Sequence, residues 1–250
     1  MRPVPYAHRP ILLISGWGMP CCVFDDLATR LSAQRTVICL DLPGYGAQSS
    51  VLPYQLPQLA EAMLDAIDAP EFDLVGWSLG GALALSMAAN SPARVKSLCL
   101  LATNPRFIAD GSWPGVRAEL LQDFSSALAG NVAQTLKRFT ALQVQGDAKA
   151  KQALPMLRNA LSAAAMPTIE VLTAGLQLLQ NYDLRAELAA LTCSVTLILG
   201  EADVLVPLTV VKHLLELQAE LKVYQVPQAG HAFFLTAPQV VTAAILAASS

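Results

Sequence analysis

Residues 72–89 read FDLVGWSLGGALALSMAA, an apolar strand-like run that passes through GWSLG (76–80) into a helix-like stretch. A serine in the pattern G-x-S-x-G, placed between a strand and a helix, is typical of a tight turn that exposes a nucleophile. The positions two before and two after Ser78 must lack bulk so that strand and helix can approach closely, and glycine occupies both. Ser78 would then lie beside a helix N-terminus, which favours developing negative charge. The alternative is a structural serine in a glycine-rich turn.

Short apolar runs and helix-like segments alternate along most of the chain. This alternation predicts an α/β fold with a parallel, doubly wound sheet whose strands are buried on both faces. The expected strands cover residues 11–14, 36–40, 73–76, 97–102, 195–200 and 221–226. The expected helices between them cover residues 25–33, 56–67, 79–89 and 209–217, and a final helix follows the last strand.

The alternation is interrupted once, between residues 104 and 183, where helix-like segments are separated only by proline and glycine. This stretch is too long for a structureless loop. We expect an all-helical insertion, a cap or lid, over residues 104–183, and an α/β core formed by residues 1–103 and 184–250.

The composition excludes several classes of protein. The 250 residues include 16 Lys and Arg against 19 Asp and Glu, a net charge of −3, and 54% of them are hydrophobic. This balance argues against disorder and against nucleic-acid binding. No run reaches the roughly 18 apolar residues of a membrane span, and the N-terminal stretch lacks a signal-peptide pattern. We expect a cytoplasmic protein that does not bind a membrane.

The sequence predicts no cofactor and no metal. It contains no glycine-rich dinucleotide motif, no P-loop and no H-E-x-x-H. The five cysteines are an odd number and lack metal-ligand spacing, so we interpret them as reduced thiols.

A serine nucleophile needs an adjacent base, and the chain has only three histidines. His8 precedes the first expected strand, and His213 lies in a helix-like pattern, where a partly exposed helix surface is the simpler interpretation. His231 follows the last expected strand, at the carboxyl edge where sites of parallel sheets form. His231 is therefore the candidate base.

The third member of such a site is a carboxylate that orients the imidazole. Asp203 follows the fifth expected strand, which gives the chain order Ser78, Asp203, His231 that is typical of α/β-hydrolases. Glu201 and Asp183 are the competing acids.

An oxyanion hole needs two backbone donors aimed at the developing charge. One candidate is the N–H of Leu79, the residue after the nucleophile. The other is the N–H of Trp17, in the loop SGWGMP (15–20) after the first expected strand. The Trp17 indole has a second interpretation, as an apolar wall of the pocket.

Together these residues resemble a known family, the pimeloyl-acyl-carrier-protein methyl ester esterases of biotin synthesis (the BioH family). The resemblance covers nearly the whole chain and rests on SGWG (15–18), DLPGYG (41–46), GWSLGG (76–81), PARV (92–95), SWPG (112–115), RFTALQ (138–143), DLR (183–185), DVLVP (203–207) and GHAFF (230–234). The cap motifs SWPG and RFTALQ make the resemblance more specific, because they distinguish this family from α/β-hydrolases in general.

The resemblance implies a carboxylesterase that removes the methyl group of the pimeloyl-carrier-protein ester. It implies a catalytic triad of Ser78, Asp203 and His231, as the residues themselves indicate. It likewise implies that Trp17 and Leu79 are the oxyanion donors. It also implies substrate contacts at Trp17 and in the cap segment that comprises Phe139, Thr140, Ala141, Leu142 and Gln143. One difference concerns Ser15, which stands where the family usually has histidine.

Acyl carrier proteins are acidic, and this chain also has a negative net charge. Binding between them therefore requires a local basic patch on this chain. Residues 137–158 carry five basic side chains against Asp147 alone, a local charge of +4; they are Lys137, Arg138, Lys149, Lys151 and Arg158. We expect them to dock the carrier protein, with a solvated helix face as the alternative, and we expect a monomer. The alternatives for function are a broad-specificity short-chain ester or thioester hydrolase and a non-catalytic binding protein of the same fold.

Overall fold

The structure is a computed structural model that describes residues 9–249. Within this range six parallel strands form one sheet, in the order β2-β1-β3-β4-β5-β6. They are β1 (Ile11–Ile14), β2 (Val37–Leu40), β3 (Phe72–Trp77), β4 (Val95–Leu101), β5 (Ser194–Gly200) and β6 (Lys222–Val226). The predicted parallel sheet is confirmed, with every strand end within two residues of its expected position.

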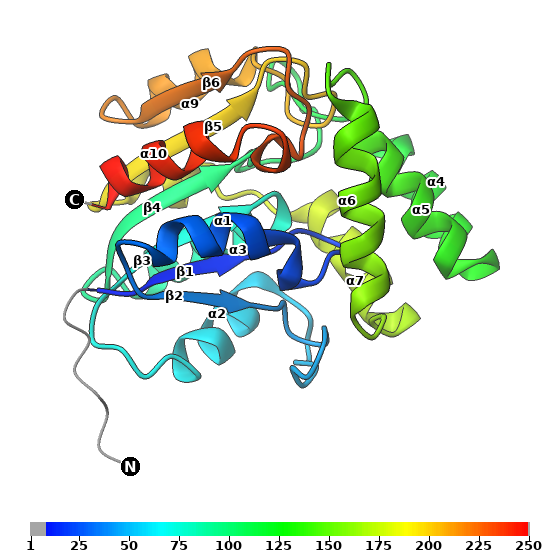
Figure 1. Cartoon of the computed structure of the whole chain (residues 1–250), viewed down its shortest axis with the longest axis horizontal. Helices are drawn as coiled ribbons and strands as arrows, with labels where there is room; N and C mark the ends of the chain where they lie inside the picture. The colour runs from blue at the N-terminus through cyan, green and yellow to red at the C-terminus, as the bar shows by residue number, and fades with distance from the viewer. Residues whose placement is uncertain (1–8, 250) are drawn as a thin grey trace.

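Helices cover both faces of the sheet (Figure 1). One face carries α1 (Asp25–Ser32) and α10 (Pro238–Ala248), and the other carries α2 (Leu56–Asp65), α3 (Leu79–Asn90), α8 (Arg185–Ala190) and α9 (Val210–Leu217). Successive side chains of a strand point to opposite faces. Accordingly Leu12 and Ile14 belong to the hydrophobic core on the α2 and α3 side, and Ile11 and Leu13 to that on the α1 and α10 side.

The inserted segment contains α4 (Ala118–Gly130), α5 (Val132–Gln143), α6 (Ala150–Ala163) and α7 (Ile169–Asn181). These helices gather at one end of the molecule, beyond the carboxyl ends of the strands (Figure 1). The segment is not helical throughout, because residues 104–117 form only turns and two isolated bridges, Ile108 with Val116 and Asp110 with Trp113. Prolines 105 and 114, which cannot donate a backbone hydrogen bond, lie in this stretch.

The two ends of the insertion lie side by side. The backbone N–H of Leu184 donates to the carbonyl of Pro105 at 2.7 Å. The Tyr182 hydroxyl donates to the carbonyl of Asn104 at 2.9 Å, and it is buried. The chain thus leaves and re-enters the core at one place.

The chain changes direction between β1 and β3, which are neighbours in the sheet. From β1 it crosses to β2 on one side, and it then returns to β3 on the other. Such a switch point opens a crevice at the carboxyl ends of the two strands, which is where ligands bind in open α/β sheets.

Glycines make the turn after β3 possible. A Cβ on Gly76 would collide with the carbonyl of Gly80 and the Cα of Gly81. A Cβ on Gly80 would collide with the carbonyl oxygens of Ile14 and Ser15, at the end of β1. Helix α3 therefore begins in direct backbone contact with β1 and β3, as the G-x-S-x-G pattern predicts.

Gly80→Ala is expected to lower the free energy of unfolding by about 3 kcal/mol, because overpacking against fixed backbone has that cost. Urea denaturation followed by circular dichroism measures it. Gly130→Ala is the matched control, since no atom lies within 4 Å of a Cβ built on Gly130. Equal stability of the two variants would contradict close backbone packing between α3 and the end of β1.

Candidate active site

Ser78 lies in the turn between β3 and α3, in a backbone conformation that side chains rarely adopt. Its φ is +55° and its ψ is −119°, which costs a residue other than glycine about 1–3 kcal/mol. The N–H of Ser78 donates to the carbonyl of Leu101 at 2.9 Å, and the carbonyl of Ser78 accepts from the start of α3. The turn is therefore held by β4 on one side and by α3 on the other.

His231 and Asp203 come together at the same edge of the sheet. His231 Nδ1 lies 2.8 Å from Asp203 Oδ2, and both side chains are fully buried. The other carboxylate oxygen of Asp203 accepts from the backbone N–H groups of Leu205 at 2.8 Å and Val206 at 3.0 Å. A carboxylate held in this way assigns the proton of a neutral imidazole to Nδ1 and leaves Nε2 as the free base.

The environment of His231 leaves its second nitrogen open. Nε2 is buried and has no hydrogen-bond partner among residues 9–249. The backbone of His231 is fixed on both sides: its N–H donates to the carbonyl of Gln143 at 3.0 Å, and its carbonyl accepts from the indole of Trp77 at 3.0 Å. Because Trp77 directly precedes Ser78, one residue links the two loops that carry the serine and the histidine.

The role of Trp77 was not predicted. The G-x-S-x-G pattern leaves its second position free, so the pattern carries no signal for the residue there. An aromatic side chain with a hydrogen-bond donor at that position, directly before the candidate nucleophile, is the one available hint.

The competing histidines and acids lie in other surroundings. His213 occupies a half-buried position on α9, with its ring 5.5 Å from the ring of Trp113, and His8 lies outside the described residues. Glu201 is exposed and accepts from the backbone N–H of Gln228.

Asp183, the other competing acid, belongs to an ion-pair cluster at the base of the insertion. Its carboxylate lies 2.6 Å from the Arg185 guanidinium. Hydrogen bonding to Arg185 holds the pKa of the Asp183 carboxyl below its ordinary range. Of the three acids considered, Asp203 is the one that contacts His231.

The loop after β1 lies against Ser78 and presents a free backbone donor. A Cβ on Gly16 would lie 3.2 Å from the Cβ of Ser78. In the part of the chain that the structure describes, no hydrogen bond uses the backbone N–H of Trp17 or of Leu79. Leu79 is the first residue of α3, where an N–H has no partner within the helix. Two unpaired donors therefore flank Ser78.

Ser15 forms a hydrogen bond within this loop. It stands where the family that the sequence resembles usually has histidine. Its hydroxyl donates to the carbonyl of Met19 at 2.8 Å, and the N–H of Met19 donates to the carbonyl of Gly16. The N–H of Gly18 donates to the hydroxyl of Tyr45 at 3.1 Å. The loop is thus closed by its own hydrogen bonds, with serine in place of histidine.

The segment 139–143 of α5 divides between two faces. Phe139, Thr140 and Gln143 are buried, and the Phe139 ring meets the Trp17 ring edge to face at a centroid distance of 4.8 Å. Ala141 is exposed and Leu142 half-buried. These two line a groove of about 530 Å³ between α4, α5 and the start of α6, together with Leu120, Phe124, Arg138, Val144, Gln145, Gly146 and Ala150.

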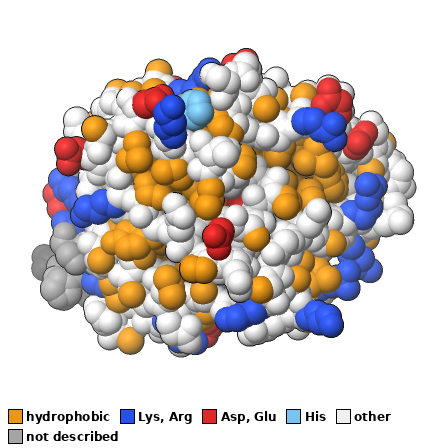
Figure 2. Space-filling view, turned by 90° about the horizontal axis from the view of Figure 1, so that it is seen from above, with side chains coloured by type: hydrophobic (Ala, Val, Ile, Leu, Met, Phe, Trp, Pro, Cys, Tyr) orange, Lys and Arg blue, Asp and Glu red, His pale blue; other side chains and the backbone are white. Residues whose placement is uncertain are grey.

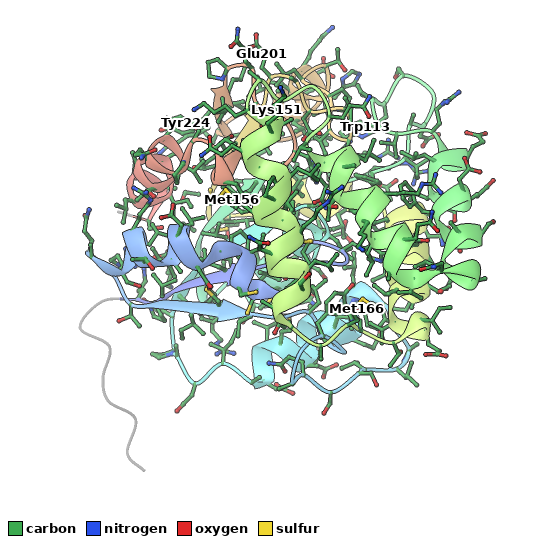
Figure 3. The ribbon with its side chains drawn as sticks, turned by 45° about the vertical axis from the view of Figure 1, so that its right-hand side comes forward. Trp113, Lys151, Met156, Met166, Glu201 and Tyr224 are labelled. Atoms are coloured by element: carbon green, nitrogen blue, oxygen red, sulfur yellow. The ribbon has the colours of Figure 1, made fainter. Side chains whose placement is uncertain are left out.

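All five basic residues singled out in the sequence are exposed; they are Lys137, Arg138, Lys149, Lys151 and Arg158. They lie on α5 and α6 and at the N-terminus of α6, and Figure 3 labels Lys151 on α6. Figure 2 shows several Lys and Arg side chains along the end of the molecule that carries the insertion. Asp147, the acid among them in the sequence, is buried. The exposed charge of this stretch is therefore positive only.

Metal sites and membrane-spanning helices are absent from the part of the chain that the structure describes. No group of three or more His, Cys, Asp or Glu side chains in residues 9–249 could hold a metal ion. No helix in that range is long and apolar enough to cross a membrane. The five cysteines are free thiols, and burial raises the pKa of Cys39 to about 11, so this thiol is protonated near neutral pH.

Comparison with solved structures shows the same fold with different reactions. An esterase from Exiguobacterium antarcticum superposes with a TM-score of 0.86 at 20% identity, covering 97% of this chain and 92% of that one. A bromoperoxidase from Bacillus anthracis superposes with a TM-score of 0.87 at 19% identity over the same shares of the two chains. These likenesses concern the fold alone.

Comparison of sequences identifies the family of this chain, which the likeness in fold does not. Residues 9–238 match the family described as the alpha/beta hydrolase fold. The chain is 37% identical to the pimeloyl-[acyl-carrier protein] methyl ester esterase of Edwardsiella ictaluri, covering 95% of this chain and 92% of that protein. It is 36% identical to the enzyme of the same name from Pseudoalteromonas atlantica, covering 90% and 88%. The chain belongs to the α/β-hydrolase fold family and, within it, to the family of pimeloyl-[acyl-carrier protein] methyl ester esterases.

Proposed function

We propose that this chain is a serine carboxylesterase that hydrolyses the methyl ester of pimeloyl-acyl-carrier protein in biotin synthesis. The observation that carries the proposal is the buried 2.8 Å contact between His231 and Asp203, at the sheet edge where the turn with Ser78 lies. Relatives that are 34–37% identical bear this activity in their names, which supports the choice of substrate.

In the proposed reaction, Ser78 Oγ attacks the ester carbonyl while His231 Nε2 accepts the hydroxyl proton. Asp203 stabilises the imidazolium that forms. The carbonyl oxygen becomes an oxyanion, and the free N–H groups of Trp17 and Leu79 donate to it. In known enzymes, one such donor lowers the barrier by about 3 kcal/mol.

The intermediate collapses when His231 returns the proton to the methoxy oxygen. The bond between the carbonyl carbon and that oxygen breaks, and methanol leaves. Water then attacks the acyl group on Ser78, with His231 again taking a proton, and a free carboxyl is released at the end of the pimeloyl chain. His231 returns that proton to Ser78 Oγ as the bond between the acyl carbon and Ser78 Oγ breaks, which regenerates the serine hydroxyl.

We assign substrate binding to the insertion, residues 104–183, acting as a cap. The buried side of α5, where Phe139 packs on Trp17, gives an apolar wall for the acyl chain beside Ser78. The groove between α4 and α5, with Arg138 among its lining residues, suits the phosphopantetheine arm, because guanidinium groups bind phosphate through paired hydrogen bonds.

We assign carrier-protein docking to the exposed basic face of α5 and α6. Acyl carrier proteins are acidic, and complementary charge speeds encounter and fixes orientation. Burial of Asp147 leaves this face without an opposing surface charge from residues 137–158. We further propose that the enzyme is a cytoplasmic monomer; free cysteines fit a reducing compartment.

A broad-specificity short-chain ester or thioester hydrolase is the second candidate, since solved structures with this fold carry other activities. Competition between pimeloyl-carrier-protein methyl ester and p-nitrophenyl butyrate separates the two. Preference for the carrier-protein substrate is expected here, and a lack of preference would favour the second candidate.

Ser78→Ala is expected to lower kcat/KM for p-nitrophenyl acetate by at least about 10³-fold, because the nucleophile is lost. The circular dichroism spectrum should remain that of the wild type. A fluorophosphonate probe should label the wild type and not the variant. Retained turnover would contradict the nucleophile assignment, and an unlabelled wild type would favour a non-catalytic binding protein.

Reversal of two charges, Arg138→Glu with Lys151→Glu, is expected to lower kcat/KM for the carrier-protein ester by about 10²-fold through loss of electrostatic encounter. The effect on a small ester should be far smaller. Lys212→Glu with Lys222→Glu is the matched control, because it changes the net charge equally on exposed positions of α9 and β6. Equal losses for both pairs would argue against docking on the insertion.

A further inference from the structure

The loop that carries His231 is held by the insertion as well as by the core. Three hydrogen bonds join residues 228–231 to residues 143–148, which connect α5 to α6. The N–H of His231 donates to the carbonyl of Gln143 at 3.0 Å, and the N–H of Ala148 donates to the carbonyl of Gln228 at 2.9 Å. The third bond runs from the N–H of Gly230 to Asp147 Oδ2, at 2.9 Å.

Asp147 supplies the single side chain among these three bonds. Its carboxylate is buried and both oxygens accept a hydrogen bond: Oδ1 from the N–H of Lys149 at 2.6 Å and Oδ2 from the N–H of Gly230 at 2.9 Å. Bonds from a backbone N–H to an ionised carboxylate are about twice as strong as those between neutral groups. Asp147 thus fixes both the start of α6 and the residue directly before His231.

Residue 230 has little room for a side chain beside this contact. A Cβ on Gly230 would lie 3.1 Å from the carbonyl of Gln143 and 3.2 Å from the Cβ of Asp147. The neighbouring turn after β5 also lies close, because a Cβ on Gly146 would meet the carbonyl of Ala202. In Figure 3 the end of α6 marked by Lys151 lies next to Glu201 in that turn.

The loop of the imidazole has few other supports of its own. Residues 227–232 form no helix or strand, and Gln228 has φ +55°. The ring of His231 is anchored at Nδ1 by Asp203, while Nε2 has no partner among the described residues. The position of Nε2 is thus set by Asp203 and by the backbone at residues 230 and 231, to which Asp147 contributes one anchor. A misplacement of about 1 Å can cost about 10²-fold in rate.

We propose that Asp147 is a positioning residue of the esterase reaction, which holds the loop of the catalytic base through the N–H of Gly230. This proposal rests on the proposed function, because it takes His231 as the base. Asp147 does not touch the reacting atoms in this role and acts through Gly230. Its sequence position, as the single acid in a basic stretch, would otherwise suggest only a surface charge.

The test compares Asp147→Ala, Asp147→Asn and the control Glu201→Ala with p-nitrophenyl acetate as substrate. Asp147→Ala is expected to lower kcat about tenfold and to leave KM within about twofold, because the base is misplaced and the pocket is not. Asp147→Asn keeps one of the two acceptor oxygens, so it should lower kcat by an intermediate factor of about threefold. Glu201→Ala removes a carboxylate that accepts from Gln228 in the same loop but is exposed, and kcat should stay within about twofold.

Active-site titration with a fluorophosphonate separates positioning from folding. Slower labelling of Asp147→Ala to the same final stoichiometry supports positioning. If Asp147→Ala fails to fold, Asp147→Asn decides: slower turnover by folded protein supports the proposal, and wild-type kcat overturns it. Wild-type kcat in a folded Asp147→Ala also overturns it. Ser78→Ala distinguishes failure of the proposed function from failure of the Asp147 proposal. Retained turnover in Ser78→Ala would refute the triad, whatever the result for Asp147.

Discussion

The site depends on the close backbone contact between the start of α3 and the ends of β1 and β3. Gly76 and Gly80 allow this contact because a Cβ on either would meet backbone atoms that cannot move aside. The contact forces Ser78 into its positive φ and leaves the first N–H of α3 without a partner beside it. It also brings the loop after β1, with the free N–H of Trp17, against the serine. One packing constraint therefore places both the proposed nucleophile and its oxyanion donors.

The parts of this arrangement that could be predicted from sequence are those encoded by local pattern. Buried parallel strands give continuous apolar runs, so the sheet was predictable to within two residues at each strand end. The order Ser78, Asp203, His231 was predictable because each residue follows a strand, and parallel strands deliver such residues to one edge. The contact between Asp203 and His231 agrees with that reasoning.

Features that depend on tertiary contacts could not be predicted in this way. The two faces of segment 139–143 are set by the packing of α5 against Trp17 on one side and by the groove on the other. The non-helical start of the insertion arises from isolated bridges between residues 108 and 116 and between 110 and 113. Ser15 was a departure from a family pattern, and only its bond to Met19 shows how the loop is closed without histidine.

Hydrogen bonding to the insertion also limits how the proposed cap can move. A rigid lift of α5 and α6 from the core would break the bonds to Gln228, Gly230 and His231 together, and would leave the loop of the proposed base held from the core by Asp203 and Trp77. The insertion therefore completes the site at its α5–α6 end, so substrate entry that preserves the base must leave this end in place. The burial of Asp147 bears on both catalysis and docking in the proposed function. The carboxylate holds Gly230 beside the proposed base, and its burial removes a negative charge from the basic surface. In this chain the face assigned to the carrier protein and the loop of the base are joined by one short connector.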